Sequence, residues 1–318
     1  MFSQDGYQAV RTAAGAAVRT DRGIVAIRGA DRLSWLQGLL TNDVANLPDG
    51  QSRYAAYLTP QGRMITDMHV VALPERVLLD VPAEVAGPLR ERLDSLIFAE
   101  DVTAEDQSMA LAVVELHGPG AMRVIGRALL SGGDQGHPAV VRDDRLGLPG
   151  YAIYVDRRAV EGILDRLTDA GATPVSLETL GVIRVEAGVP AFGSDMDEET
   201  IPLEAGIEDR AVSFTKGCYV GQEVIVRVTT RGGGRVARRL VGLAFGEGDA
   251  VQPGDVLAAA DGGRELGRVT SVAWSPALLR TIALGYVHRD FTEPGTAVTA
   301  SDGERRLQGE VRPLPFVG

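Results

Sequence analysis

The densest group of reactive side chains lies at residues 216–223, which read Lys-Gly-Cys-Tyr-Val-Gly-Gln-Glu. Cys218 is the only cysteine, and Lys216 is the only lysine among 32 basic residues. A chain that uses arginine almost everywhere indicates that position 216 needs a compact ammonium rather than a flat guanidinium. An ammonium near a thiol stabilises the thiolate, so we predict Lys216 and Cys218 as a catalytic pair. The alternatives are a lysine kept by chance and a Cys218 that is a small buried apolar side chain.

The end of this segment offers polar groups for a ligand. Gln222 carries both a donor and an acceptor, and Glu223 can accept two parallel hydrogen bonds from an amidine-like edge. The conformation of residues 222–227 stays open. Three consecutive β-branched residues favour a strand, whereas Glu223 and Arg227 are spaced to pair on a helix.

Composition narrows the class of protein. The 318 residues correspond to about two domains, and 45% hydrophobic with 24% charged residues is typical of a globular chain. One cysteine excludes an internal disulfide and cannot alone hold an iron–sulfur cluster, and four scattered histidines predict no metal site. The net charge of -11 argues against broad binding to nucleic acids or membranes. With no membrane-length apolar run and no secretion signal, we expect a cytoplasmic protein.

The elements that must position these residues are helices and strands in mixed order, which favours an α+β fold. A strand at 23–28 precedes a helix that Asp31 can cap, and Asn42 and Asp43 end that helix as turn residues or serve as ligands. Further elements are expected as a hairpin of strands 54–58 and 64–73, helices at 82–96 and 160–170, strands at 109–116 and 151–155, and a loop at 131–138.

From residue 238 the pattern changes to short alternating segments cut by glycine and proline, which predict a small β-barrel or sandwich. The segments are 240–245, 256–260, 266–271, 281–287, 297–300 and 307–312.

Five arginines lie within thirteen residues next to the Cys218 segment: Arg227, Arg231, Arg235, Arg238 and Arg239. One interpretation is a flexible linker at 231–235 with solvated charges. The other is an anion patch for a polyglutamate tail or the phosphates of tRNA, which the last four arginines would contact.

Residues 216–227, as Lys-Gly-Cys-Tyr-x-Gly-Gln-Glu-x-x-x-Arg, resemble the signature of the YgfZ family of folate-binding proteins. That family is related to the glycine-cleavage T-protein and assists iron–sulfur enzymes. Other segments agree in order: Thr-Asn-Asp-Val at 41–44, Leu-Thr-Pro-Gln-Gly-Arg at 58–63, Gly-Leu-Pro-Gly-Tyr at 147–151, Arg-x-Glu-Ala-Gly at 184–188, Asp-Met-Asp-Glu at 195–198, Gly-x-Val-Thr-Ser at 267–271 and Ser-Pro at 275–276.

The resemblance implies two interleaved α/β lobes over residues 1–230 and a C-terminal β-barrel over 236–318, arranged around a central tetrahydrofolate site. It implies that Asp67 bonds a folate nitrogen and that Tyr54 packs against the pterin. From the residues alone, Asp67 can instead cap the hairpin or be an ordinary exposed strand residue, and Tyr54 can be simple packing. Arg184 is either a ligand for the folate glutamate or part of an ion pair with Glu186.

The T-protein differs from this chain at two points. It has two adjacent aspartates where this chain has Thr66-Asp67, and a pterin-binding glutamate in a Tyr-Thr-Gly-Glu motif where residues 148–151 read Leu-Pro-Gly-Tyr. Loss of a hydrogen-bond partner costs about 1 to 3 kcal/mol, so classical T-protein activity is not expected while some folate affinity remains.

The resemblance therefore predicts a protein that binds tetrahydrofolate or a one-carbon derivative and supports iron–sulfur enzymes, including tRNA-modifying ones. The folate-binding set is Tyr54, Asp67, Arg184, Gln222, Glu223 and Arg227. The alternatives are an aminomethyltransferase, and a folate-binding module in which Cys218 has no role.

Overall fold

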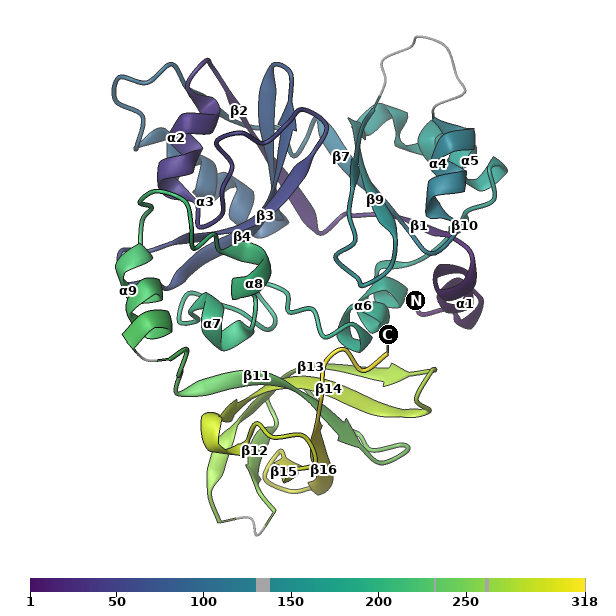
Figure 1. Ribbon diagram of the computed structural model, residues 1–318. Helices are drawn as coiled ribbons and strands as arrows, with labels where there is room; N and C mark the ends of the chain where they lie inside the picture. Colours follow the sequence, from purple (N-terminus) through teal and green to yellow (C-terminus); the bar gives the residue numbers. More distant parts are fainter. Residues whose placement is uncertain (130–137, 232, 261–262, 318) are drawn as a thin grey trace. The chain divides into compact units, whose positions relative to one another are not determined.

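The computed structural model describes residues 1–129, 138–231, 233–260 and 263–317 (Figure 1). Its contacts divide the chain into two units. Unit 1 comprises residues 1–58, 65–180 and 210–220, and unit 2 comprises residues 59–64, 181–209 and 221–318. The loop predicted at 131–138 lies outside the described residues except for its last position.

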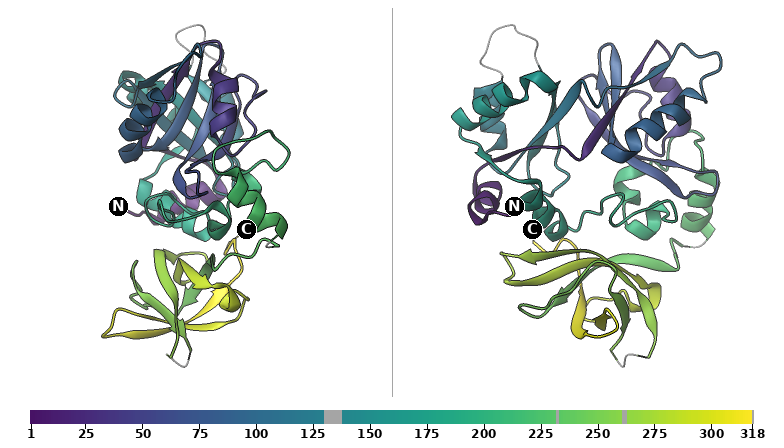
Figure 2. Two further views of the ribbon diagram at one scale, coloured as in Figure 1. Left: turned by 90° about the vertical axis from the view of Figure 1, so that its left-hand side faces the viewer. Right: turned by 180° about the vertical axis from the view of Figure 1, so that it is seen from behind.

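Unit 1 contains two five-stranded sheets that share the chain in an interleaved order (Figures 1 and 2). The first sheet has the order β10 (Thr173–Pro174), β1 (Gly15–Val18), β7 (Leu111–His117), β9 (Gly150–Asp156) and β8 (Ala139–Arg142). The second has the order β3 (Ser52–Leu58), β4 (Met64–Leu73), β5 (Arg76–Pro82), β2 (Arg22–Arg28) and β6 (Thr103–Asp106). Along the chain, β1 belongs to the first sheet, the next five strands form the second sheet, and β7 to β10 complete the first sheet.

The helices of unit 1 cover the outer faces of these sheets. Apolar residues of α2 (Arg32–Leu39) and α3 (Ala83–Asp94) pack on the second sheet, and those of α4 (Ala121–Ala128) and α5 (Val160–Asp169) pack on the first. Helix α1 (Gln4–Thr12) contacts β1, and α6 (Leu177–Glu186) leads into unit 2. A smaller core, which includes Ile24, Leu78 and Val113, joins the two sheets face to face.

Asp31 occupies the N-cap position of α2, but its side chain makes no cap hydrogen bond. Its Oδ2 instead accepts from the backbone N–H of Asp101 at 2.9 Å. The predicted helix start is confirmed, whereas the predicted role of the carboxylate is wrong, because it joins two loops.

Unit 2 holds a closed barrel of six antiparallel strands in the order β11, β14, β13, β12, β15, β16. The strands are β11 (Arg238–Phe245), β12 (Val256–Ala259), β13 (Glu265–Ser275), β14 (Arg280–His288), β15 (Ala297–Ser301) and β16 (Arg306–Arg312). All six correspond to predicted segments. Strand β13 continues four residues beyond the predicted end at Ser271, because pairing with β14 resumes after a β-bulge at 269–271.

Short helices connect the parts of unit 2: α7 (Pro202–Ala205), α8 (Glu208–Ala211), which ends in unit 1, and α9 (Gln222–Val226). Val185 of α6 packs on Ile282 and Leu284 of the barrel. No helix of the described residues is both long and apolar enough to cross a membrane.

Candidate functional site

Tyr54 and Asp67 lie on the neighbouring strands β3 and β4 of unit 1, where the sequence predicted two folate-binding residues. The Tyr54 hydroxyl donates to Asp67 Oδ2 at 2.7 Å. Asp67 is only 8% exposed, and its Oδ1 is buried without a hydrogen-bond partner among the described residues. Burial and the charge of Asp67 raise the pKa of Tyr54 well above its usual 10, so that the phenol stays protonated and keeps donating. The pair therefore leaves one buried carboxylate oxygen without a donor among the described residues.

Two residues that the sequence analysis missed surround Tyr54. The Arg210 guanidinium lies over the Tyr54 ring, 5.5 Å from its centroid, and the His69 ring packs against it with centroids 5.1 Å apart. Burial, assisted by the charge of Arg145, lowers the pKa of His69 well below 6.5, so this imidazole is neutral. His69 was detectable, because Asp67 and His69 share one face of β4 by strand alternation. Arg210 carried no local signal.

Asn42 connects this site to the segment that precedes Lys216. Its side-chain amide donates to the carbonyls of Tyr54 at 2.9 Å and Arg210 at 2.8 Å, and its Oδ1 accepts from the N–H of Asp43. The sequence interpretations of Asn42, as a turn residue or as a ligand, are therefore incomplete. Its side-chain amide also joins strand β3 to residue 210.

Lys216 binds the C-terminal end of α2. Its Nζ donates to the carbonyl oxygens of Gln37 at 2.7 Å, Leu40 at 2.7 Å and Asn42 at 2.9 Å. Burial lowers the pKa of Lys216 to about 8, against the opposing effect of Asp43. Since an ammonium has three N–H donors, these carbonyls occupy all of them. A flat guanidinium does not match three converging carbonyls, so the geometry explains the single lysine through helix capping rather than through the thiol.

Cys218 follows in an irregular segment of unit 1 and is exposed. Its interpretation as a buried apolar side chain is therefore wrong. The neighbouring Tyr219 is buried, and its ring lies 5.3 Å from Lys216 Nζ. The ammonium thus contacts helix carbonyls and an aromatic face, while the reactivity of the thiol stays a prediction.

Arg184 of α6 lies in a polar cluster of unit 2. Its Nη1 donates to Asp195 Oδ2 at 2.6 Å and to the Val189 carbonyl, and its Nη2 donates to Ser271 Oγ at 2.8 Å. Glu186 instead accepts from Ser275 Oγ at 2.5 Å. The predicted pairing of Arg184 with Glu186 is wrong, because the loop after α6 brings Asp195 to the guanidinium. A folate contact by Arg184 stays a prediction.

Gln222 and Glu223 begin helix α9, and Arg227 begins the π-helical turn that follows it, so the open choice between helix and strand resolves as helix. Gly221 precedes the helix with a φ of +83°, which favours glycine. Glu223 and Arg227 are exposed. Three of the six residues predicted to bind folate are therefore presented by one short helical segment.

The turn between β3 and β4 packs against α9 within unit 2. Gly62 has a φ of +76°, and a Cβ at this position would lie 2.8 Å from the Cβ of Val224. Residues 58–63 and 216–227 are two separate segments that resemble the YgfZ family. The structure brings the turn of the first and the helix of the second into contact, which explains why glycine stands at 62.

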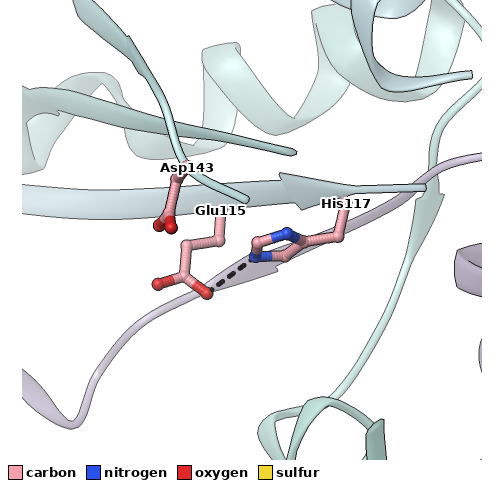
Figure 3. Close-up of side chains that lie close together, drawn as sticks. All are labelled: Glu115, His117 and Asp143. Carbon is pink, nitrogen blue, oxygen red and sulfur yellow. Dashed lines mark hydrogen bonds and ion pairs between the residues drawn. The ribbon is translucent and has the colours of Figure 1, made fainter. Parts of the chain in front are cut away.

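A second polar cluster lies buried in unit 1, where Glu115, His117 and Asp143 come together (Figure 3). His117 Nε2 is 3.1 Å from Glu115 Oε2. These residue types can bind a metal ion, but Arg19 and Arg145 already contact the two carboxylates, Arg19 with Glu115 at 2.5 Å and Arg145 with Asp143 at 2.7 Å. Although burial opposes it, these guanidiniums hold the pKa of Glu115 well below 4.5. The charges are thus compensated without a cation, and we interpret the cluster as structural.

Comparisons with known proteins agree with this architecture. Residues 2–134 match the family model of the GCVT N-terminal domain, and residues 238–317 match that of the glycine cleavage T-protein C-terminal barrel domain. An aminomethyltransferase of Rubrobacter xylanophilus is 33% identical over 290 residues, which cover 86% of this chain and 75% of the relative. The chain belongs to the glycine-cleavage T-protein family. An aminomethyltransferase of Bacillus subtilis is 29% identical over 295 residues, 86% of this chain and 79% of the relative.

A solved structure of a T-protein shares the fold of this family member. The glycine cleavage system aminomethyltransferase T from Bartonella henselae superimposes with a TM-score of 0.86, at 24% identity, over 98% of this chain and 89% of that one. The predicted fold class, interleaved α/β lobes followed by a barrel, is confirmed.

In this T-protein-family chain the predicted site residues are divided between the two units. Unit 1 holds Tyr54, Asp67, Lys216 and Cys218, and unit 2 holds Arg184, Gln222, Glu223 and Arg227. Among the described residues, Tyr54 and Asp67 are the one pair of the predicted set whose side chains hydrogen-bond to each other.

Proposed function

We propose that this chain binds a reduced folate at Tyr54 and Asp67 and acts on the one-carbon unit that the folate carries. The observation that supports the proposal is the buried Oδ1 of Asp67, which lacks a partner among the described residues. A buried carboxylate oxygen without a donor is costly, and such costs are typical of functional sites. The pterin ring of a reduced folate offers N–H donors of the kind that this oxygen requires.

Each neighbouring residue has a role in this arrangement. The Tyr54 hydroxyl holds Asp67 Oδ2, which fixes the carboxylate and directs the other oxygen away from the tyrosine. His69 and Arg210 both pack against the Tyr54 ring. When bound, tetrahydrofolate supplies a nitrogen that accepts a one-carbon group, and the residues above orient its pterin.

Calorimetric titration with tetrahydrofolate tests the proposal. We expect saturable heat at one site per chain and a rise of the melting temperature with folate concentration, because a ligand that binds only the folded state stabilises it. Folic acid, whose oxidised pterin lacks some of these N–H donors, serves as the weaker-binding control. Absence of both heat and thermal shift at millimolar tetrahydrofolate contradicts the proposal.

Two finer functions are compatible with folate binding. The names of the relatives support aminomethyl transfer better than a role in iron–sulfur maintenance. The substitution at residue 66 weighs little against transfer, because neighbouring strand residues point to opposite faces. Thr66 is fully buried, and its hydroxyl donates to the carbonyl of Asp67 at 3.0 Å. The missing pterin glutamate at 148–151 remains the argument against transfer.

Maintenance of iron–sulfur enzymes, including those that modify tRNA, is the second candidate function. It is favoured by the exposed Cys218, which lies in the segment that resembles the YgfZ family.

The variant Cys218→Ala distinguishes the two candidate functions. Under the maintenance proposal, we expect the variant to lower iron–sulfur enzyme activity in cells that lack the native protein, with tetrahydrofolate affinity unchanged. Under the transfer proposal, purified protein moves the carbon of a lipoyl-carried aminomethyl group to added tetrahydrofolate, which yields methylenetetrahydrofolate, ammonia and the dithiol form of the carrier, and Cys218→Ala retains that activity. Full complementation by Cys218→Ala contradicts a role for the thiol.

A further inference from the structure

An open pocket of 420 Å³ lies at one end of the barrel in unit 2. It is lined by Gly234, Arg235, Val236, Arg239, Arg289, Asp290 and Thr292. Three guanidiniums and one carboxylate give this lining a net positive charge, in a chain whose net charge is -11. The volume is within the range of about 300 to 1,000 Å³ that is typical of small-molecule sites.

The pocket wall is fixed by the barrel. Strands β11 and β14 pair antiparallel, with Arg238 opposite His288 and Arg239 opposite Val287, so the beginning of one strand lies beside the end of the other. The Arg289 N–H donates to the Ala237 carbonyl at 3.1 Å, which joins the two segments beyond the strand ends. Arg239 and Arg289 are thus presented by a hydrogen-bonded framework, and Arg235 lies in the irregular segment that leads into β11.

The charges in the pocket are only partly compensated. Arg239 Nη2 contacts Glu208 Oε1 at 3.3 Å, and Arg289 Nε lies 3.7 Å from Asp290 Oδ1. Across the described part of the chain, no carboxylate lies within ion-pair distance of Arg235. By contrast, Arg238 forms an ion pair with Glu204 at 3.1 Å, and its guanidinium lies over the Tyr286 ring. The side chain of Arg231 is outside the described residues.

We propose that this pocket binds a small polyanion with at least two oxyanion groups, whose phosphates or carboxylates accept from Arg235, Arg239 and Arg289. Guanidinium groups match these oxyanions through paired N–H donors. A concave site of this volume fits a small ligand better than a nucleic-acid backbone, which requires an extended basic surface. The inference does not depend on folate binding.

Titration with tripolyphosphate at low ionic strength tests the site. We expect Arg235→Gln and Arg289→Gln each to weaken binding by about tenfold, the effect of removing one charge-assisted contact of about 1.4 kcal/mol. Asp290→Asn removes the carboxylate of the pocket, so we expect tighter binding. Arg268→Gln, at an exposed arginine of β13 in the same barrel, serves as the matched control and keeps the native affinity.

A parallel titration with citrate distinguishes a preference for carboxylates from one for phosphates, and either ligand supports the site. Three outcomes overturn it: no binding of either anion, equal weakening by Arg268→Gln and the pocket variants, or binding of tRNA that tripolyphosphate does not displace. The last outcome would identify the ligand of this pocket as a nucleic acid instead of a small polyanion. Melting temperatures of the variants establish that each one is folded.

Discussion

Asp67→Asn is expected to weaken tetrahydrofolate binding by about 10- to 100-fold without lowering the melting temperature of the free protein. A hydrogen bond to a charged group contributes about 1.5 to 3 kcal/mol, and each 1.4 kcal/mol is about tenfold in affinity. Asparagine can still accept from the Tyr54 hydroxyl with its oxygen, but it then places an amide donor where Asp67 Oδ1 is now buried without a partner. Calorimetry measures the affinity, and thermal denaturation measures the stability.

Two further variants complete this test. Tyr54→Phe removes the donor that holds the carboxylate, so we expect an intermediate loss of affinity. Asp165→Asn changes an exposed carboxylate on α5 and serves as the control. If Asp67→Asn binds tetrahydrofolate as tightly as the native protein, Asp67 is not a ligand and the folate assignment loses its main support.

Lys216→Arg is expected to destabilise unit 1 although it conserves the charge. The three carbonyls of Gln37, Leu40 and Asn42 converge on one nitrogen, and a planar guanidinium cannot satisfy them from the same position. At least one carbonyl of the α2 end then loses its partner, which costs about 1 to 3 kcal/mol. For a unit of this size, we expect the melting temperature to fall by about 2 to 12 °C.

Lys216→Met removes the charge as well and should lower the melting temperature further, because a cation at a helix C-terminus is itself stabilising. The matched control exchanges the residues in the opposite direction: Arg166→Lys, on an exposed position of α5, is expected to leave the melting temperature unchanged. Equal melting temperatures for native protein and Lys216→Arg refute the capping role and leave the thiol as the explanation for the lysine.

The barrel was predictable because each of its strands is indicated by the sequence of a short segment. Alternating apolar residues and glycine-containing turns define six strands segment by segment, and each one corresponds to a strand of the structure. Helix α9 was ambiguous, since β-branched residues and an i,i+4 charge pair favour opposite conformations. Its position after Gly221 and against Gly62 is set by packing, which no short segment encodes.

The site was predictable only in its residue types. The sequence predicted Tyr54 and Asp67 as site residues. It could not predict that one Asp67 oxygen lacks a partner, because this depends on where Arg210 and the neighbouring strands lie. The lone lysine was a correct signal, but its three carbonyl partners were not foreseen, and its effect on the thiol stays a prediction. Its nearest neighbours in the sequence suggested the thiol, whereas its carbonyl partners are more than 170 residues away along the chain.

The interleaving of the two sheets imposes an order on how the chain folds during synthesis. The second sheet, β2 to β6, is built from contiguous residues, so it can form as soon as residue 106 has left the ribosome. Strand β1 must wait for β7, since Gly15 pairs with His117. The cap on α2 comes later still, because Lys216 follows Leu40 by 176 residues, a delay of roughly 10 to 40 seconds at ribosomal rates of about 5 to 20 residues per second.

This order exposes β1 to the cell before its partners exist. A chain that stops at residue 134 carries β1 and β7, which pair with each other, but lacks β10 and β9, so the outer edge of each strand has no partner. Unpaired strand edges are the usual origin of aggregation in nascent chains. Strand β1 is therefore incompletely paired until β10 at residues 173–174 has been synthesised.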